Sequence, residues 1–173
     1  MPIENEKRYL LSESPSWNTF DISELIMYEI SQFYICYDPE RKFVSRVRRI
    51  KEQGSSDDAI YIRTDKIGKG ENTREIEYII NENSYFEYME FFQIGQFISK
   101  IRYTWEKSES EVWEFDFYPN GLMIAEIELQ YVGQTFDLPF KTGTYEELND
   151  FRYSNLQMAL KGVPEPKRKL DDE

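Results

Sequence analysis

The 173-residue sequence contains no histidine, one cysteine and no apolar run of about 18 residues that could cross a membrane as a helix. The lack of histidine excludes Ser-His-Asp triads, histidine-ligated zinc and acid–base catalysis by imidazole. Cys36 has no partner for an intrachain disulfide, so a reducing cytoplasm is the expected location. Residues 1–8 show no basic region followed by an apolar stretch, so no signal peptide is expected.

The chain is also poor in positive charge, with a formal net charge of −12 at pH 7. A broad basic surface is therefore absent, and we do not expect nucleic acid as a partner. The ordinary role of such a charge is solubility. A small polyanionic ligand remains compatible with it, because a local basic pocket can outweigh the global field. Without histidine, a metal site must be built from carboxylates, which suits Mg²⁺, Mn²⁺ or Ca²⁺.

Aromatic residues are abundant, at 16% of the chain, and most of them are tyrosine or phenylalanine, which favour strands. Apolar and polar residues alternate with a period of two in eight runs, which is typical of half-buried strands. The predicted strands cover residues 3–11, 27–37, 41–51, 58–66, 73–80, 97–106, 110–118 and 122–132. Helices are predicted over residues 84–93 and 153–161, while residues 12–26 show no clear pattern.

Short connections without a strand–helix–strand rhythm predict an antiparallel sheet. With eight strands, closure into a barrel would remove the exposed edges. We therefore predict a mainly β (α+β) fold, with a closed eight-stranded barrel and a few covering helices. Residues 1–162 are expected to form this single domain, as a monomer or homodimer. Residues 163–173 are expected to be a disordered charged tail.

Charged residues share one face within each predicted strand, because side chains at i and i+2 point the same way. The acids are Glu4 and Glu6, Glu75 and Glu77, Glu114 and Asp116, and Glu126 and Glu128; the bases are Arg8, Arg46, Arg48, Lys66, Lys100 and Arg102. One explanation is a half-buried sheet with its charges in water. However, acids and bases lie mostly on different strands, and the opposite faces are aromatic or aliphatic. We therefore predict that the charges line a polar barrel interior.

Such an interior suits a complex of a metal ion with a polyphosphate. Carboxylates bind hard divalent cations through oxygen, while Arg and Lys bind phosphate oxygens. The sequence lacks a P-loop, since the Gly68-Lys69-Gly70 stretch is too short to form one.

Nine short segments in order resemble motifs of the CYTH superfamily, which includes class IV adenylate cyclases, thiamine triphosphatases and inorganic triphosphatases. The opening Glu4-Asn5-Glu6-Lys7-Arg8 is similar to its ExExK motif. The other matching segments are Gln32-Phe33-Tyr34, Arg46-Val47-Arg48, Thr64-Asp65-Lys66, Glu75-Ile76-Glu77, Lys100-Ile101-Arg102-Tyr103, Trp113-Glu114-Phe115-Asp116, residues 121–129 and residues 150–155. The resemblance spans about residues 3–160.

This resemblance implies a triphosphate tunnel that depends on Mg²⁺ or Mn²⁺ and binds a ligand such as tripolyphosphate, ATP or thiamine triphosphate. It implies metal-side carboxylates at Glu4, Glu6, Glu75, Glu77, Asp116, Glu126 and Glu128. It implies phosphate contacts at Arg46, Arg48, Lys66, Lys100 and Arg102. Catalytic roles would fall on Glu6, Arg8 and Asp116, the last as a metal-side or water-positioning acid.

The chain departs from the opening motif at Arg8, where the motif has lysine. Arginine keeps the charge but lacks the compact ammonium and its tunable pKa. Three functions therefore remain open. The leading hypothesis is a metal-dependent triphosphatase. A non-catalytic protein that binds a nucleotide or polyphosphate is the alternative favoured by Arg8, and a class IV-type adenylate cyclase ranks below them because no adenine pocket is recognisable.

Divalent cations should stabilise the folded protein, because apposed carboxylates repel one another and a cation bound only by the folded state adds stability by mass action. At a hundredfold excess over Kd, the gain is about 2.7 kcal/mol. Thermal melts with and without millimolar Mg²⁺ or Mn²⁺ measure it, and Glu126→Gln should reduce the shift. No shift with either metal, with or without tripolyphosphate, would contradict the predicted metal site.

Overall fold

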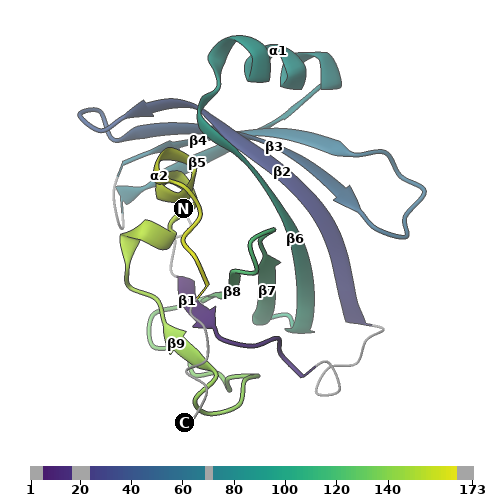
Figure 1. Ribbon diagram of the computed structural model, residues 1–173, viewed down its shortest axis with the longest axis vertical. Helices are drawn as coiled ribbons and strands as arrows, with labels where there is room; N and C mark the ends of the chain where they lie inside the picture. Colours follow the sequence, from purple (N-terminus) through teal and green to yellow (C-terminus); the bar gives the residue numbers. More distant parts are fainter. Residues whose placement is uncertain (1–5, 17–23, 69–71, 167–173) are drawn as a thin grey trace.

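The computed structural model describes residues 6–16, 24–68 and 72–166, which form one antiparallel sheet with two α-helices (Figure 1). The strands are β1 (Glu6–Leu11), β2 (Leu25–Asp38), β3 (Phe43–Glu52), β4 (Ile60–Ile67), β5 (Arg74–Ile80), β6 (Ile94–Ser108), β7 (Glu111–Phe117), β8 (Met123–Glu128) and β9 (Tyr145–Glu147). The helices are α1 (Glu82–Phe92), a 3-10 turn η4 (Phe151–Tyr153) and α2 (Asn155–Lys161). No helix within these ranges has the length and apolar character needed to span a membrane.

The antiparallel, mainly β fold is confirmed, but the strand number differs from the prediction. The eight predicted strands correspond to β1 to β8, and the short β9 adds a ninth by pairing with β1. The strand order is β5-β4-β3-β2-β6-β7-β8-β1-β9. Across the described ranges no ladder joins β5 to β1 or β9, so the hydrogen bonds form a strongly curved open sheet and not the predicted closed eight-stranded barrel (Figure 1).

Alternation along each strand separates the sheet into an apolar outer face and an inner face that carries charge. On the outer face, Phe33 and Val47 are buried against Tyr85 of α1. Also on the outer face, Trp113 and Phe115 are covered by the segment that follows β8. The outer cluster on β1, β7 and β8 includes Tyr9, Ile127 and Leu129, with Phe136, Leu138 and Phe140 packed on it. Burial of apolar area in these two layers stabilises the outer face of the sheet.

The helix α1 begins with a cap, and side-chain contacts hold it on the outer face of the sheet. Asn81 accepts a hydrogen bond from the backbone N–H of Ser84, which satisfies one of the free donors of the first turn. Tyr85 packs edge-on against Phe33 at a ring-centroid distance of 5.3 Å. The hydroxyl of Tyr88 accepts a hydrogen bond from Arg63, so that α1 is tied to β4 as well.

The second helix, α2, covers one end of the inner face. Met158 and Ala159 are buried in a cluster with Leu10, Ile98 and Ile124, which share the inner face with the charged residues of β1, β6 and β8. Ser154 caps α2 by accepting from the backbone N–H of Gln157. One end of the inner face is therefore apolar and closed by α2, and the charged residues lie beyond it.

Residues 163–166, at the start of the predicted tail, also lie against the domain. Val163 packs on the cluster around α2, and the carbonyl oxygen of Pro164 accepts a hydrogen bond from Asn120. Residues 167–173 lie outside the described ranges, as do residues 3–5 of the first predicted strand.

Replacing Gly95 should displace α2. Gly95 has a φ of 67°, and a Cβ there would lie 2.5 Å from the carbonyl oxygen of Ala159 in α2. Gly133 has a similar φ of 81° but no atom near the added Cβ, so Gly133→Ala isolates backbone strain. We expect Gly133→Ala to lower the free energy of unfolding by about 1 kcal/mol and Gly95→Ala by about 3 kcal/mol. Urea unfolding measures both, and equal losses would contradict the close contact.

Candidate functional site

The inner face of the curved sheet encloses a polar cavity of about 710 Å³. Every strand from β1 to β8 contributes to its wall, and α2 contributes Asn155. The charged residues that line it are Glu6, Arg46, Arg48, Lys66, Arg74, Glu75, Glu77, Lys100, Arg102, Glu114, Glu126 and Glu128. The alternation in the sequence thus places most of the predicted site residues around one space. Glu4 lies outside the described residues.

The cationic wall of the cavity is built mainly by β3 and β4. Arg48 donates hydrogen bonds from Nη2 to Glu77 Oε1 at 2.9 Å and to Thr64 Oγ1 at 3.3 Å. Lys66 Nζ lies 3.7 Å from Glu75 Oε2. Arg46 differs from both, since it makes no ion pair with any described residue and its buried Nε has no hydrogen-bond partner there. This wall consequently carries uncompensated donors that an anion could satisfy.

The electrostatics of Arg48 show the same excess of positive charge. The pKa of Arg48 is lowered to about 10, first by burial and second by the neighbouring charge of Arg46. Glu77 raises this pKa, but by less than Arg46 lowers it. Two arginines on one strand therefore repel each other inside a partly buried space. A bound anion would relieve this repulsion, because opposite charges at close range favour the ionised form.

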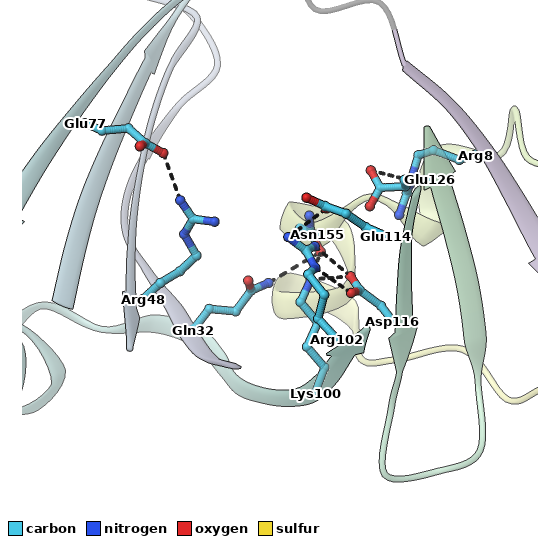
Figure 2. Close-up of polar contacts among 10 residues, drawn as sticks. All are labelled: Arg8, Gln32, Arg48, Glu77, Lys100, Arg102, Glu114, Asp116, Glu126 and Asn155. Atoms are coloured by element: carbon cyan, nitrogen blue, oxygen red, sulfur yellow. Dashed lines mark hydrogen bonds and ion pairs between the residues drawn. The ribbon is translucent and has the colours of Figure 1, made fainter. Parts of the chain in front are cut away.

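Asp116 is buried between two cations of β6 (Figure 2). Its Oδ2 lies 2.7 Å from Lys100 Nζ, and its two oxygens accept from Arg102 Nε and Nη2 at 2.7 and 2.9 Å. Arg102 also pairs with Glu114 at 2.8 Å. Both oxygens of Asp116 are therefore occupied, and Asp116 acts as the counterion of Lys100 and Arg102. The metal-side or water-positioning role implied by the resemblance does not fit this arrangement.

The pKa values within this cluster reflect competition between burial and charge. Burial would raise the pKa of Asp116, but Lys100 and Arg102 outweigh it and hold that pKa well below its usual range. The pKa of Lys100 is lowered to about 8, chiefly by burial. Asp116 raises this pKa in part, and Arg102 lowers it further. The three side chains form one buried unit with an excess of positive charge.

The acidic wall lies across the cavity on β1, β7 and β8. Glu6 is directly opposite Glu128 in the β1–β8 ladder, and Glu114 is directly opposite Glu126 in the β7–β8 ladder. Cross-strand neighbours of this kind have Cβ atoms about 5 Å apart, so like charges repel. Burial raises the pKa of Glu114, and Glu126 and Asp116 raise it further despite the nearby Arg102.

These carboxylates have the donor chemistry that Mg²⁺ or Mn²⁺ requires. Among the described residues, however, no three acidic side chains are grouped closely enough to hold a metal ion. Glu75 and Glu77 lie on β5, on the cationic side, where they pair with Lys66 and Arg48. The carboxylates predicted to bind metal therefore lie on two different walls. Those on β5 are paired with cations, whereas Glu6 on β1 and Glu128 on β8 face each other as like charges.

Arg8 lies beside the acidic wall and faces a second, smaller cavity. Its Nε is 3.5 Å from Glu126 Oε1, and this buried Nε has no hydrogen-bond partner among the residues described. The second cavity has a volume of about 170 Å³ and is lined by Glu6, Arg8, Tyr34, Val44, Arg46, Thr64, Lys66, Ser154, Asn155 and Leu156. Glu6, Arg46, Lys66 and Asn155 line both cavities, which makes the two spaces neighbours.

Several residues that line the cavity, among them Asn155, Gln32 and Glu114, had no predicted metal, phosphate or catalytic role. Asn155 of α2 accepts from Gln32 Nε2 at 3.4 Å and from Lys100 Nζ at 3.5 Å (Figure 2). Gln32 is 1% exposed, and its Oε1 has no partner within the described chain. The alternation did predict Glu114 on the inner face together with Asp116, but assigned it no role. Asn155 carries no such signal, because its position depends on how α2 packs on the sheet.

No family model matches the sequence, and no curated protein sequence matches it. Solved structures with the same curved antiparallel fold do match. The crystal structure of the hypothetical protein NE1496 matches with a TM-score of 0.57 and 23% identity, covering 93% of this chain and 99% of that chain. The PH1819 protein from Pyrococcus horikoshii OT3 matches with a TM-score of 0.53 and 18% identity, covering 75% of this chain and 80% of that chain. At these identities the similarity shows the fold alone.

Lys100 should make stability rise with pH above pH 8. The folded state releases the Lys100 proton near pH 8, whereas the unfolded chain keeps it up to about pH 10.5. Between these values the unfolded state binds more protons, so the free energy of unfolding gains up to about 1.4 kcal/mol per pH unit. Lys100→Met should remove this rise.

Urea unfolding between about pH 7 and 10 gives the free energy of unfolding of wild type and of Lys100→Met, and the test is the difference between the two at each pH. Lys107→Met, nearer the far end of β6 where Lys107 pairs with Glu111 at 3.3 Å, controls for the loss of a lysine. Parallel curves for wild type and Lys100→Met would contradict the prediction.

Proposed function

We propose that the protein is a metal-dependent triphosphatase that binds inorganic or organic triphosphate in the cavity. The observation that carries this proposal is the division of one cavity into two walls of opposite charge. Arg46 and Arg48 present buried donors without partners on one wall, and Glu126 and Glu128 lie on the other. A polyanion bound together with a divalent cation would neutralise both walls at once.

The order of the nine motifs supports membership of the CYTH superfamily and, with it, a tunnel-like interior. The curved sheet and the placement of the motif charges on its inner face agree with that proposal. A closed barrel would require β5 to meet the β1–β9 edge, and side chains of β5 and β1 already line the same cavity.

The cationic residues would hold the phosphate groups. Arg46, Arg48 and Lys66 approach from β3 and β4, while Lys100 and Arg102 approach from β6. Hydrogen bonds between cations and phosphate oxygens are roughly twice as strong as neutral ones, and arginine can bind two oxygens at once. Because Asp116 fixes Lys100 and Arg102, these two side chains are positioned before the ligand arrives.

A divalent cation bound together with the phosphates would take carboxylate oxygens from the acidic wall, where Glu6 is opposite Glu128, and its other ligands would be phosphate oxygens and water. When bound there, Mg²⁺ or Mn²⁺ would neutralise phosphate charge and lower the pKa of a coordinated water. Glu6 lines both cavities, and its carboxylate would act as the base that takes the proton from the attacking water. Arg8, next to Glu126, would contact the phosphate at which the P–O–P bond breaks and stabilise its charge.

Non-catalytic binding of a nucleotide or polyphosphate is the second candidate function. It is favoured by Arg8, which occupies the motif's lysine position and extends its guanidinium toward Glu126. An arginine can bind phosphate but does not exchange a proton near neutral pH. If turnover requires that proton, the cavity would capture the ligand without cleaving it.

Calorimetric binding and phosphate release on the same samples separate these functions. The ligands are tripolyphosphate, ATP and thiamine triphosphate, each with Mg²⁺ and Mn²⁺. Wild type should bind at least one and release phosphate from it. Arg46→Ala should weaken binding at least tenfold, because it removes charge-assisted contacts. Arg41→Ala is the matched control, since Arg41 lies in the exposed β2–β3 turn.

Arg8 provides the sharper distinction. Arg8→Ala should lower the rate far more than it weakens binding, which is the mark of a contact made in the transition state. Arg8→Lys should retain or raise the rate. Binding without phosphate release would identify a binding protein, and formation of cyclic AMP from ATP would identify a cyclase. Neither binding nor release with any ligand would refute the proposal.

A further inference from the structure

One long edge of the sheet has no partner strand. β5 lies at the end of the strand order, and among the described residues it pairs with β4 alone (Figure 1). Its register with β4 is continuous, and it contains neither lysine nor proline. The opposite edge, β9, is only three residues long. Proteins usually shorten, bend or charge their edge strands, because free backbone N–H and C=O groups invite another strand to pair. β5 lacks most of these protections.

The outer side of β5 is apolar and accessible. Alternation places Ile76, Tyr78 and Ile80 on the outer face, and Glu75 and Glu77 on the inner face. Ile76 is 46% exposed and Tyr78 45%. The two acids pair with cations of β3 and β4. A strand docked on this edge would therefore meet apolar side chains on one face and acids that already have counterions on the other.

Contacts with β4 and α1 hold this outer surface in place. The guanidinium of Arg63 lies over the rings of Tyr78 and Tyr88, at 6.0 and 5.6 Å from their centroids. Arg63 is itself fixed by Asp65 and by the Tyr88 hydroxyl, each at 3.0 Å. α1 packs over β2 and β3 and leaves Ile76 and Tyr78 accessible (Figure 1). A surface that is ordered beforehand loses little conformational entropy when a partner binds.

We propose that β5 is the contact between two copies of this chain, which pair antiparallel about a two-fold axis at Tyr78. A strand that pairs with its own copy must be self-complementary, because each contact across the axis occurs twice. With this axis, Tyr78 is opposite Tyr78 of the second copy, and Ile76 is opposite Ile80. Aromatic and aliphatic cross-strand pairs of this kind stabilise a sheet. The proposal goes beyond triphosphate binding and does not depend on it.

The charges along β5 agree with this register. Arg74 of one copy is opposite Glu82 of the other, which lies in the first turn of α1, and this pair occurs twice. Both side chains are exposed. The two acids of β5 are opposite Ile79 and Asn81, so no two like charges are directly opposite each other. The edge is therefore complementary to itself in charge as well as in apolar surface.

Other positions of the axis fit less well. An axis at Ile76 would set Glu75 opposite Glu77 twice, and an axis at Glu77 would set Glu77 opposite itself. Like charges directly opposite each other are destabilising. An axis at Ile79 would leave much less of β5 paired. The axis at Tyr78 avoids the repulsion and keeps most of the strand in the ladder.

Two other partners compete for the same edge. If the sheet closed onto the β1–β9 edge of its own chain, β5 would have no free side for a second copy, because each side of a strand pairs with one neighbour. An extended segment of a different protein could also add to β5. Both alternatives leave the purified chain monomeric, so its mass in solution separates them from the proposal.

Analytical ultracentrifugation of the full chain measures this mass. Wild type should have twice the mass of the 20.9 kDa chain. Tyr78→Asp sets two carboxylates against each other at the axis and should raise the Kd of the dimer about tenfold or more. Within one copy the new carboxylate lies near Arg63, so the fold should persist, and thermal melts check it. Phe91→Asp is the matched control, because Phe91 is a 69% exposed aromatic residue of α1 away from β5.

Cysteine cross-linking tests the register without lowering stability through charge. In a Cys36→Ser background, Tyr78→Cys places two thiols directly opposite each other, and mild oxidation should join the copies by a disulfide. Ile76→Cys is the control on the same strand and face, because its two thiols would lie four residues apart, roughly 13 Å. A monomeric wild type, an unchanged Kd for Tyr78→Asp, or cross-linking at residue 78 that is absent or no stronger than at residue 76 would overturn the proposal.

Discussion

The arrangement of the site depends on one buried ion cluster, in which Asp116 holds Lys100 and Arg102. Burying a single charge is highly unfavourable, and the unit is tolerated because each charge has an opposite neighbour at hydrogen-bond distance. The cluster also matches the ladder, since Arg102 is directly opposite Asp116 on β6 and β7. Arg102 also pairs with Glu114 at 2.8 Å, so the cluster links β6 and β7 through two carboxylates. The same contacts that stabilise the sheet therefore also fix Lys100 and Arg102 at the wall of the cavity.

The division of the sheet into two faces could be read from the sequence because it depends on local alternation. On β7, Trp113 and Phe115 are fully buried outside, whereas Glu114 and Asp116 point inward. No partner strand needs to be known to make that assignment. The same reasoning placed Arg46, Arg48 and Lys100 on the inner face, where all three line the cavity.

Features that depend on distant partners could not be predicted in this way. Arg46 and Arg48 are equivalent by alternation, yet only Arg48 has Glu77 within reach. Glu77 and Glu126 both belong to acidic pairs at a spacing of two, but they lie on opposite walls because β5 and β8 occupy distant places in the sheet. β9 is only three residues long and has no period to detect. Asn155 reaches the site through the packing of α2, which no local pattern describes.

The position of β1 in the sheet has a consequence for how the chain folds. β1 is first in sequence but lies between β8 and β9, so that Glu6 pairs with Glu128 and Tyr9 with Glu147. Contacts between such distant segments carry a large loop-closure entropy and slow folding. During synthesis β1 must remain without its partner strands until residues 123–147 have emerged, with the apolar Tyr9 and Leu11 unpaired for that time. The acidic wall, which needs Glu6 beside Glu128, would accordingly be among the last parts of the domain to form.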